Sequence, residues 1–165
     1  MNNELTALDI QKMQQELDYR RLELMPELIE EVKRTRAFGD LSENYEYKAA
    51  KQAQNANKKR IRYLTRMIES AQIIEDASAP DEVGLFDLVE LYLEEDDDTE
   101  TVQVVTTVRC DPRQGRVSKE SPMGKALLGR KLGDRFQVTV SDSYSYYVVV
   151  RSITKQTDDG SAPIL

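Results

Sequence analysis

The first half of the chain places its apolar residues with the period of a helix. From Leu5 to about Ile74 the sequence is rich in Glu, Lys, Arg, Gln, Leu, Met and Ala, and this pattern is broken once, near Gly39. Two helices are therefore predicted, and each carries one narrow apolar stripe. The stripe positions are Leu17, Leu24, Leu28 and Val32 on the first helix and Tyr47, Ala50, Ile61, Leu64, Ile68 and Ala71 on the second.

A narrow apolar stripe is buried well by a single partner helix. Because the connection around Gly39 is short, the two helices are predicted to fold back on each other as an antiparallel hairpin. Pro26 interrupts the first arm. It lacks a backbone donor and crowds the preceding turn, so we expect a kink or a helix restart there.

The second half of the chain has the pattern of a β-sheet. Its apolar segments are rich in β-branched and aromatic residues, and Asp, Gly, Ser and Pro stand between them. One short helix is predicted at Pro122–Leu128, with Ser121 as its N-cap. The acidic run Glu94–Asp98 shows no ligand spacing and is interpreted as a solvated loop between two strands. The predicted strands cover residues 85–93, 101–108, 136–140 and 144–153.

These patterns predict an α+β fold in which a long helical hairpin precedes a small sheet domain with one short helix. The boundary is expected at a short polar segment that contains Pro80. The predicted parts are the hairpin at 1–76 with its acidic tip at 39–47, a linker at 77–82, the sheet domain at 83–156 and a flexible tail at 157–165.

Composition excludes several kinds of chemistry. The chain has no histidine and a single cysteine, Cys110, which excludes disulfide frameworks, zinc sites and histidine-based catalysis. The start of the chain lacks a basic segment followed by an apolar core, and no apolar run approaches the length that spans a bilayer, so we expect a cytoplasmic protein. The net charge of −7 argues against non-specific binding of free nucleic acid.

Positive charge is nevertheless concentrated on the second helical arm. Residues 47–74 hold seven positive side chains and one negative, whereas residues 77–165 hold ten positive and sixteen negative. RNA lying beside the arm is one interpretation of this distribution. An ordinary solvated helix face is the other.

The predicted turn between the arms carries three carboxylates within seven residues, Asp40, Glu43 and Glu46. In one interpretation Asp40 and Glu43 form a capping box, and Gly39 ends the preceding helix. In the other, Asp40 and Glu43 supply half of a magnesium site, because Mg²⁺ is usually held by one or two protein carboxylates together with substrate phosphates. Local pattern alone leaves both interpretations open.

Two motifs resemble those of a known family. The sequence GDLSENYEY at 39–47, followed by Ala49-Ala50-Lys51, resembles the hairpin-tip motif GDLxENAEY of the Gre transcript-cleavage factors. The sequence SPMGKALLG at 121–129, with Gly133-Asp134, resembles the family's SPIGRALLGxxxGD. The resemblance covers Leu5 to about Ile153, and it implies a coiled-coil hairpin followed by an FKBP-like, polymerase-docking domain.

The resemblance also implies a function. Factors of this family insert the hairpin into the secondary channel of bacterial RNA polymerase, where the acids that match Asp40 and Glu43 help to hold catalytic Mg²⁺ shared with the polymerase. The polymerase then cuts backtracked RNA, so the chain is not expected to be an enzyme or to hold a cofactor of its own. We expect it to be a monomer. Arg36, Lys48 and Lys51 are predicted to lie nearest the nascent RNA 3′ end. Docking is predicted to use Ser121, Pro122 and Met123.

The chain departs from the family pattern at three positions, with Tyr45 for the usual alanine, Met25 for an arginine and Asp87 for a glycine. Tyr45 keeps one alternative open, a Gre-homologous regulator that occupies the channel without stimulating cleavage. The FKBP-like domain suggests a prolyl isomerase, but fold alone is a weak warrant for activity. A passive coiled-coil adaptor would explain the arms and would leave the acidic tip unexplained.

Overall fold

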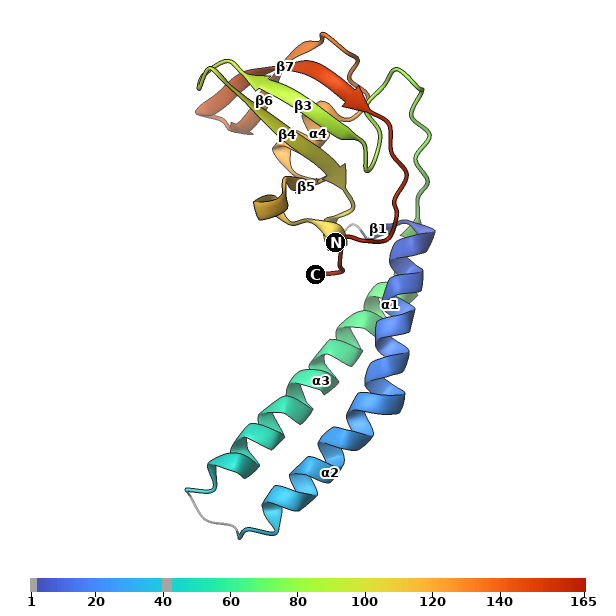
Figure 1. Ribbon diagram of the computed structural model, residues 1–165, viewed down its shortest axis with the longest axis vertical. Coiled ribbons are helices and arrows are strands. Elements are labelled where there is room, and N and C mark those ends of the chain that lie inside the picture. Colours follow the sequence, from blue (N-terminus) through green and yellow to red (C-terminus); the bar gives the residue numbers. More distant parts are fainter. Residues whose placement is uncertain (1–2, 40–42) are drawn as a thin grey trace. The chain divides into compact units, whose positions relative to one another are not determined.

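The chain forms two compact units in a computed structural model that describes residues 3–39 and 43–165 (Figure 1). The hairpin unit consists of Ile10–Gln72 and the first residues of the chain. The sheet unit consists of Glu4–Asp9 and Ile73–Leu165, so its amino-terminal part includes the first turn of the first helix. No helix among the described residues is long and apolar enough to cross a membrane.

The hairpin unit has two antiparallel arms. Its first arm contains α1 (Ala7–Tyr19), a π-helical turn (Arg20–Leu24) and α2 (Met25–Arg36). Its second arm is α3 (Tyr45–Glu69), whose 25 residues span about 37 Å at 1.5 Å per residue. α2 packs along α3, which confirms the predicted hairpin (Figure 1). Along the predicted stripes, Leu17, Ala50 and Leu64 are buried and the other positions are half-buried.

The first arm changes its hydrogen-bonding pattern just before Pro26. The Met25 N–H donates to the carbonyl of Arg20, five residues earlier, and Pro26 lies in the first turn of α2. Proline has no N–H and would crowd the carbonyl four residues before it, so one widened turn lets the chain remain helical. Of the two outcomes predicted at Pro26, a kink or a helix restart, the structure shows the second: a new α-helical segment begins at Met25, directly after the π-helical turn.

Polar side chains join the two arms at this widened turn. Asn57 is 2% exposed; its Nδ2 donates to the Arg20 carbonyl at 3.2 Å, and its Oδ1 accepts from Arg20 Nη1 at 3.0 Å. The Glu16 carboxylate accepts from Arg20 and Arg60 at 2.8 and 2.9 Å. The hydrogen bond from Arg60 lowers the pKa of Glu16, which keeps this carboxylate charged. These contacts exist in only one register of the two arms.

The sheet unit is built on a five-stranded sheet with the order β5-β4-β3-β7-β6. The only parallel pair in this sheet joins β4 and β5, and its other neighbours are antiparallel. The strands are β3 (Leu88–Leu93), β4 (Asp98–Val105), β5 (Arg116–Ser118), β6 (Arg135–Ser141) and β7 (Tyr144–Thr154). Two short strands, β1 (Glu4–Leu5) and β2 (Gln72–Ile73), lie outside this sheet, and short 3₁₀ turns cover Thr107–Arg109 and Pro112–Gln114.

The predicted short helix is α4 (Pro122–Leu127), and it packs against β4, β5 and β6 (Figure 1). Ser121 Oγ accepts from the Gly124 N–H at 3.0 Å, which confirms the predicted N-cap. Leu127 is fully buried in the core between helix and sheet. The first four residues of the acidic run form the turn between β3 and β4, as predicted, and its last residue, Asp98, begins β4.

The first strand of the sheet was predicted to begin at residue 85, but β3 begins at Leu88. Asp87 explains this difference. This carboxylate is fully buried and accepts from the backbone N–H groups of Gly84 at 2.7 Å and Gln156 at 2.9 Å. It also accepts from Lys155 Nζ at 2.6 Å. The segment before Leu88 is therefore a turn fixed by a side chain, and an acid at this position has a full set of partners.

One buried ion network ties distant segments of the sheet unit together. Arg109 is fully buried, and its guanidinium contacts Asp9 at 3.0 Å and Asp158 at 2.7 Å. Asp9 also accepts from Thr106 Oγ1 at 2.7 Å. The structure thus differs from the predicted flexible tail at 157–165, because Asp158 pairs with Arg109 and Ala162 is buried.

We expect Arg109→Ala to lower the free energy of unfolding by about 3–5 kcal/mol, because removal of one partner leaves the buried Asp9 carboxylate without its cation. Urea denaturation followed by circular dichroism measures the change. Arg113→Ala, at an exposed position in the same segment, is the matched control and is expected to change stability by less than about 0.5 kcal/mol. Equal effects of the two variants would contradict this account of Arg109.

Candidate functional site

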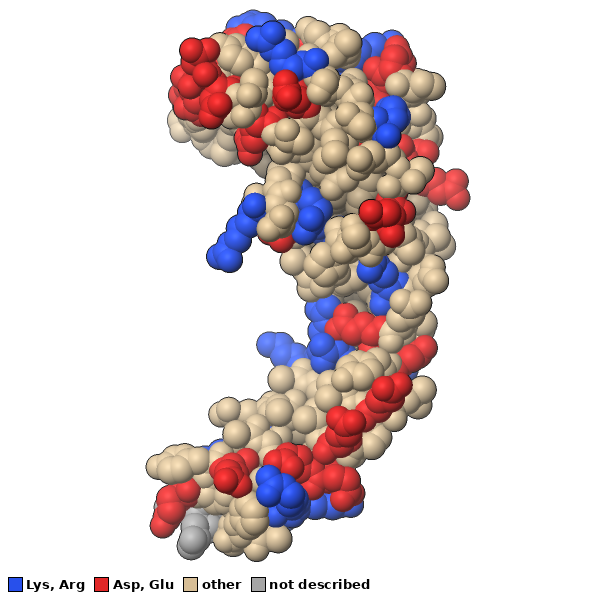
Figure 2. Space-filling view, in the orientation of Figure 1, with Lys and Arg blue, Asp and Glu red and all other residues tan. Residues whose placement is uncertain are grey.

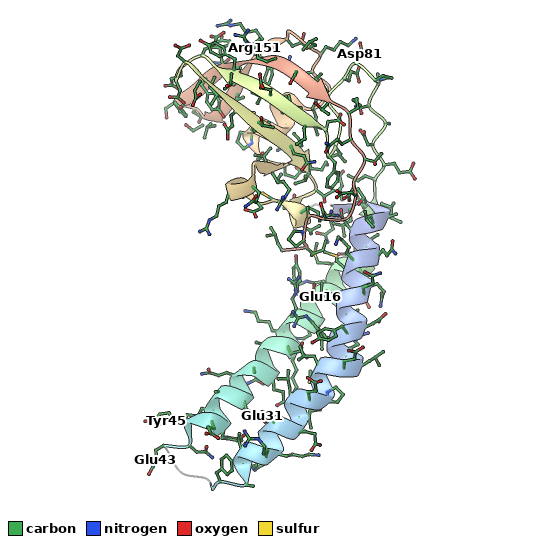
Figure 3. All side chains as sticks on the ribbon, viewed as in Figure 1. Glu16, Glu31, Glu43, Tyr45, Asp81 and Arg151 are labelled. Atoms are coloured by element: carbon green, nitrogen blue, oxygen red, sulfur yellow. The ribbon has the colours of Figure 1, made fainter. Side chains whose placement is uncertain are left out.

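The hairpin tip carries the motif at 39–47, and the structure describes Gly39 and residues 43–47 of it. Gly39 follows the end of α2 with φ 108°, a left-handed region that favours glycine. Glu43 and Tyr45 lie at the far end of the hairpin, beside the start of α3 (Figure 3). Asp40, the other predicted magnesium ligand, lies outside the described residues.

Asn44 holds the described part of the tip together. Its Oδ1 accepts from the Tyr47 N–H at 3.2 Å, which makes Asn44 the N-cap of α3. Its Nδ2 donates to the carbonyls of Gly39 at 2.9 Å and Thr35 at 3.1 Å. One side chain therefore caps the second arm and binds the end of the first.

The cap at Asn44 places Glu43 one residue before the N-cap of α3 and not at the third helical position, where a capping box needs its acid. Asp40, the other member of the predicted capping box, lies outside the described residues. α3 begins at Tyr45, so the position that needs a cap is Asn44 itself. The sequence offered a signal for this assignment, because asparagine is among the best N-cap residues and stands directly before the first helical residue. Glu43, one residue earlier, is exposed.

The predicted magnesium site consists of two carboxylates of the tip motif, Asp40 and Glu43. Among residues 3–39 and 43–165, no group of three or more His, Cys, Asp or Glu residues could hold a metal ion. Asp40 and Glu43 would supply two hard oxygen ligands, which matches the small number of protein carboxylates that Mg²⁺ usually takes.

The predicted RNA-contacting residues Arg36, Lys48 and Lys51 are all exposed near the tip. Lys51 Nζ donates to Gln54 at 3.4 Å. Farther along α3 lies a groove of about 430 Å³, whose lining includes Lys59, Arg60, Arg62 and Arg66. Figure 2 shows acidic side chains along the first arm of the hairpin, with Lys and Arg side chains among them near the tip.

The predicted docking residues at the start of α4 differ in exposure. Pro122 is exposed, whereas Ser121 is half-buried and its hydroxyl is used as the N-cap. Met123 is half-buried and packs against the core. Leu127 and Leu128 are buried and half-buried in the core, as their apolar character predicts.

We expect Asn44→Ala to loosen the tip, because loss of an N-cap costs about 1 kcal/mol. Amide hydrogen exchange of Tyr47, measured by NMR, should accelerate about fivefold or more. Asn44→Asp keeps the capping oxygen and loses both donors, so it should protect Tyr47 while weakening the contact with Gly39. Asn55→Ala, at an exposed position of α3, is the control. Unchanged exchange in Asn44→Ala would exclude Asn44 as the cap.

The chain matches two models of one protein family. "Transcription elongation factor, N-terminal" matches residues 3–73, and "Transcription elongation factor, GreA/GreB, C-term" matches residues 77–155. It is 44% identical over 131 residues to the transcription elongation factor GreA of Geobacillus kaustophilus (79% of this chain, 82% of the relative). It is 36% identical over 152 residues to GreA of Oenococcus oeni (92% and 94%). A solved structure, GreA factor homolog 1 of Thermus thermophilus, is 27% identical, with 94% and 100% coverage and a TM-score of 0.44. The chain belongs to the GreA/GreB family of transcription elongation factors.

Proposed function

We propose that this member of the family stimulates the endonucleolytic cleavage of backtracked RNA by bacterial RNA polymerase and so rescues arrested complexes. The hairpin enters the secondary channel of the polymerase and brings its tip to the active site and the nascent RNA 3′ end. The observation that carries this proposal is the tip motif at 39–47 in a chain that belongs to the GreA/GreB family. Asn44 is the N-cap of α3, so Glu43 does not occupy the N-cap position of this 25-residue arm.

Hydrolysis itself belongs to the polymerase in this proposal. Asp40 and Glu43 would hold Mg²⁺ jointly with polymerase carboxylates, and that ion would activate the attacking water and stabilise charge on the phosphodiester. The other residues of this chain position the tip and the RNA. Asn44 fixes the backbone that carries Glu43, and Arg36, Lys48 and Lys51 lie near the RNA phosphates.

Docking to the polymerase is assigned to the sheet unit. The motif at 121–129 forms α4 and its N-cap, with Pro122 exposed at the start of the helix. Ser121 and Met123 would contribute from half-buried positions, so the proposed contact centres on the first turn of α4.

We expect the double variant Asp40→Asn, Glu43→Gln to abolish cleavage stimulation while the chain still folds and docks. Each amide keeps the shape of the acid and removes the negative charge that a hard divalent cation needs, so the cleavage rate should fall by orders of magnitude. Cleavage is measured on reconstituted backtracked complexes. The melting temperature should stay within a few degrees of wild type, and competition with wild type for polymerase should persist.

The same experiment separates the proposed function from the channel-binding regulator. Full stimulation by the double variant would rule out a part for the two acids in cleavage. Absence of stimulation by the wild-type chain, with binding intact, would establish the regulator instead. If the double variant has lost affinity for Mg²⁺, added Mg²⁺ should restore part of its activity.

We expect neutralisation of Arg36, Lys48 and Lys51 to glutamine to reduce cleavage most in complexes with longer extruded RNA. Contacts between cations and phosphates weaken with salt, so the difference from wild type should shrink as ionic strength rises. Cleavage rates over a series of extrusion lengths, each at two salt concentrations, measure this. An equal loss at every length would indicate a docking defect.

A further inference from the structure

Two large aromatic side chains are exposed at the tip, one at the end of each arm. Phe38 follows α2 and is 54% exposed, and Tyr45 is the first residue of α3 and is 73% exposed. Neither ring is buried in the hairpin seam, so neither is needed to pack the two arms. Tyr45 replaces the alanine usual at this position of the motif and therefore adds an aromatic ring to the tip.

Each ring has a cation over it. The Arg34 guanidinium carbon lies 5.4 Å from the centroid of the Phe38 ring, and Lys48 Nζ lies 5.5 Å from the centroid of the Tyr45 ring. Glu31 holds Arg34 in place with hydrogen bonds of 2.9 and 2.7 Å. A cation over one face of a ring orients it and leaves the opposite face for a second planar group.

The two rings line one hollow of about 460 Å³, together with Glu43, Asn44 and Glu46. Its wall thus combines aromatic surface with two carboxylates. A phosphate would be repelled by the two carboxylates. A nucleobase suits this wall, because it is uncharged, has a flat π-face that stacks on an aromatic ring and carries N–H groups that can donate to the exposed Glu46 carboxylate.

We propose that this hollow receives an unpaired nucleobase at the 3′ end of backtracked RNA, and that the base stacks on Tyr45 with Phe38 as the second ring. The inference rests on the proposed function, because it names the part of the substrate that the tip recognises. Tyr45 acts as a positioning residue: it holds the terminal nucleotide so that the scissile phosphodiester stays in the polymerase active site.

The test compares two RNAs in reconstituted complexes backtracked by one nucleotide, one with a natural 3′ base and one with an abasic 3′ nucleotide. Each is cleaved with saturating wild-type factor, Tyr45→Ala, Tyr45→Phe or Leu22→Ala. The last variant removes an exposed apolar side chain far along the chain from the tip, 74% exposed, and serves as the control. Melting curves of each variant verify that the hairpin is folded.

With the natural base, Tyr45→Ala should slow cleavage about 5- to 150-fold, the range that stacking of one base on an aromatic ring covers. Tyr45→Phe keeps the ring and should recover most of the rate. With the abasic RNA, wild type and Tyr45→Ala should cleave at the same rate, because no base is present to stack. Phe38→Ala should show the same dependence on the base with a smaller loss.

Two results would overturn the inference. An equal loss on both RNAs would mean that Tyr45 contacts the polymerase, and no loss on either would mean that the ring binds nothing in the complex. Failure of the proposed function gives a different pattern, because wild-type factor would then stimulate cleavage of neither RNA at any concentration.

Discussion

Each arm of the hairpin has only one neighbouring helix against which to bury its side chains, and the rest of the hairpin unit depends on this constraint. A single apolar seam stabilises the pairing of the two arms but does not determine their register, because similar apolar residues can meet in several registers. Polar groups determine the register here. Asn57 binds the Arg20 carbonyl at the widened turn, and Asn44 binds both arms at the tip. At the tip, the side-chain amide of Asn44 thus both caps the second arm and binds the end of the first.

Most of the fold could be predicted from sequence because its long elements have strong periodicity. The two arms, the restart at Pro26 and the four longer strands follow from apolar spacing, proline geometry and β-branched residues. β5 escaped prediction because it has three residues and pairs in parallel with β4. The contact of residues 157–165 with the sheet unit escaped too, since it depends on Arg109, 49 positions before Asp158 in the chain.

The candidate site was only partly predictable, for a similar reason. A motif indicates which residues gather in a loop, but the position of the helix start decides which of them is the cap. Asp40 and Glu43 have the spacing of a capping box, and Asn44 takes that part because α3 begins one residue after it. At α4 the motif likewise did not indicate how deeply each of its residues is buried. Met123 packs on the core although its neighbour Pro122 is exposed.

The polar contacts at the widened turn before Pro26 also fix the length of the hairpin. A shift of one arm past the other by one helical turn would move the tip by about 5.4 Å. Such a shift would separate Asn57 from the carbonyl it binds and would break the contact between Glu16 and Arg60. Sliding is a common way for paired helices to transmit motion, and this pair cannot slide without losing buried polar contacts. These contacts therefore hold the two arms in one register, so the distance from the widened turn to the tip stays constant.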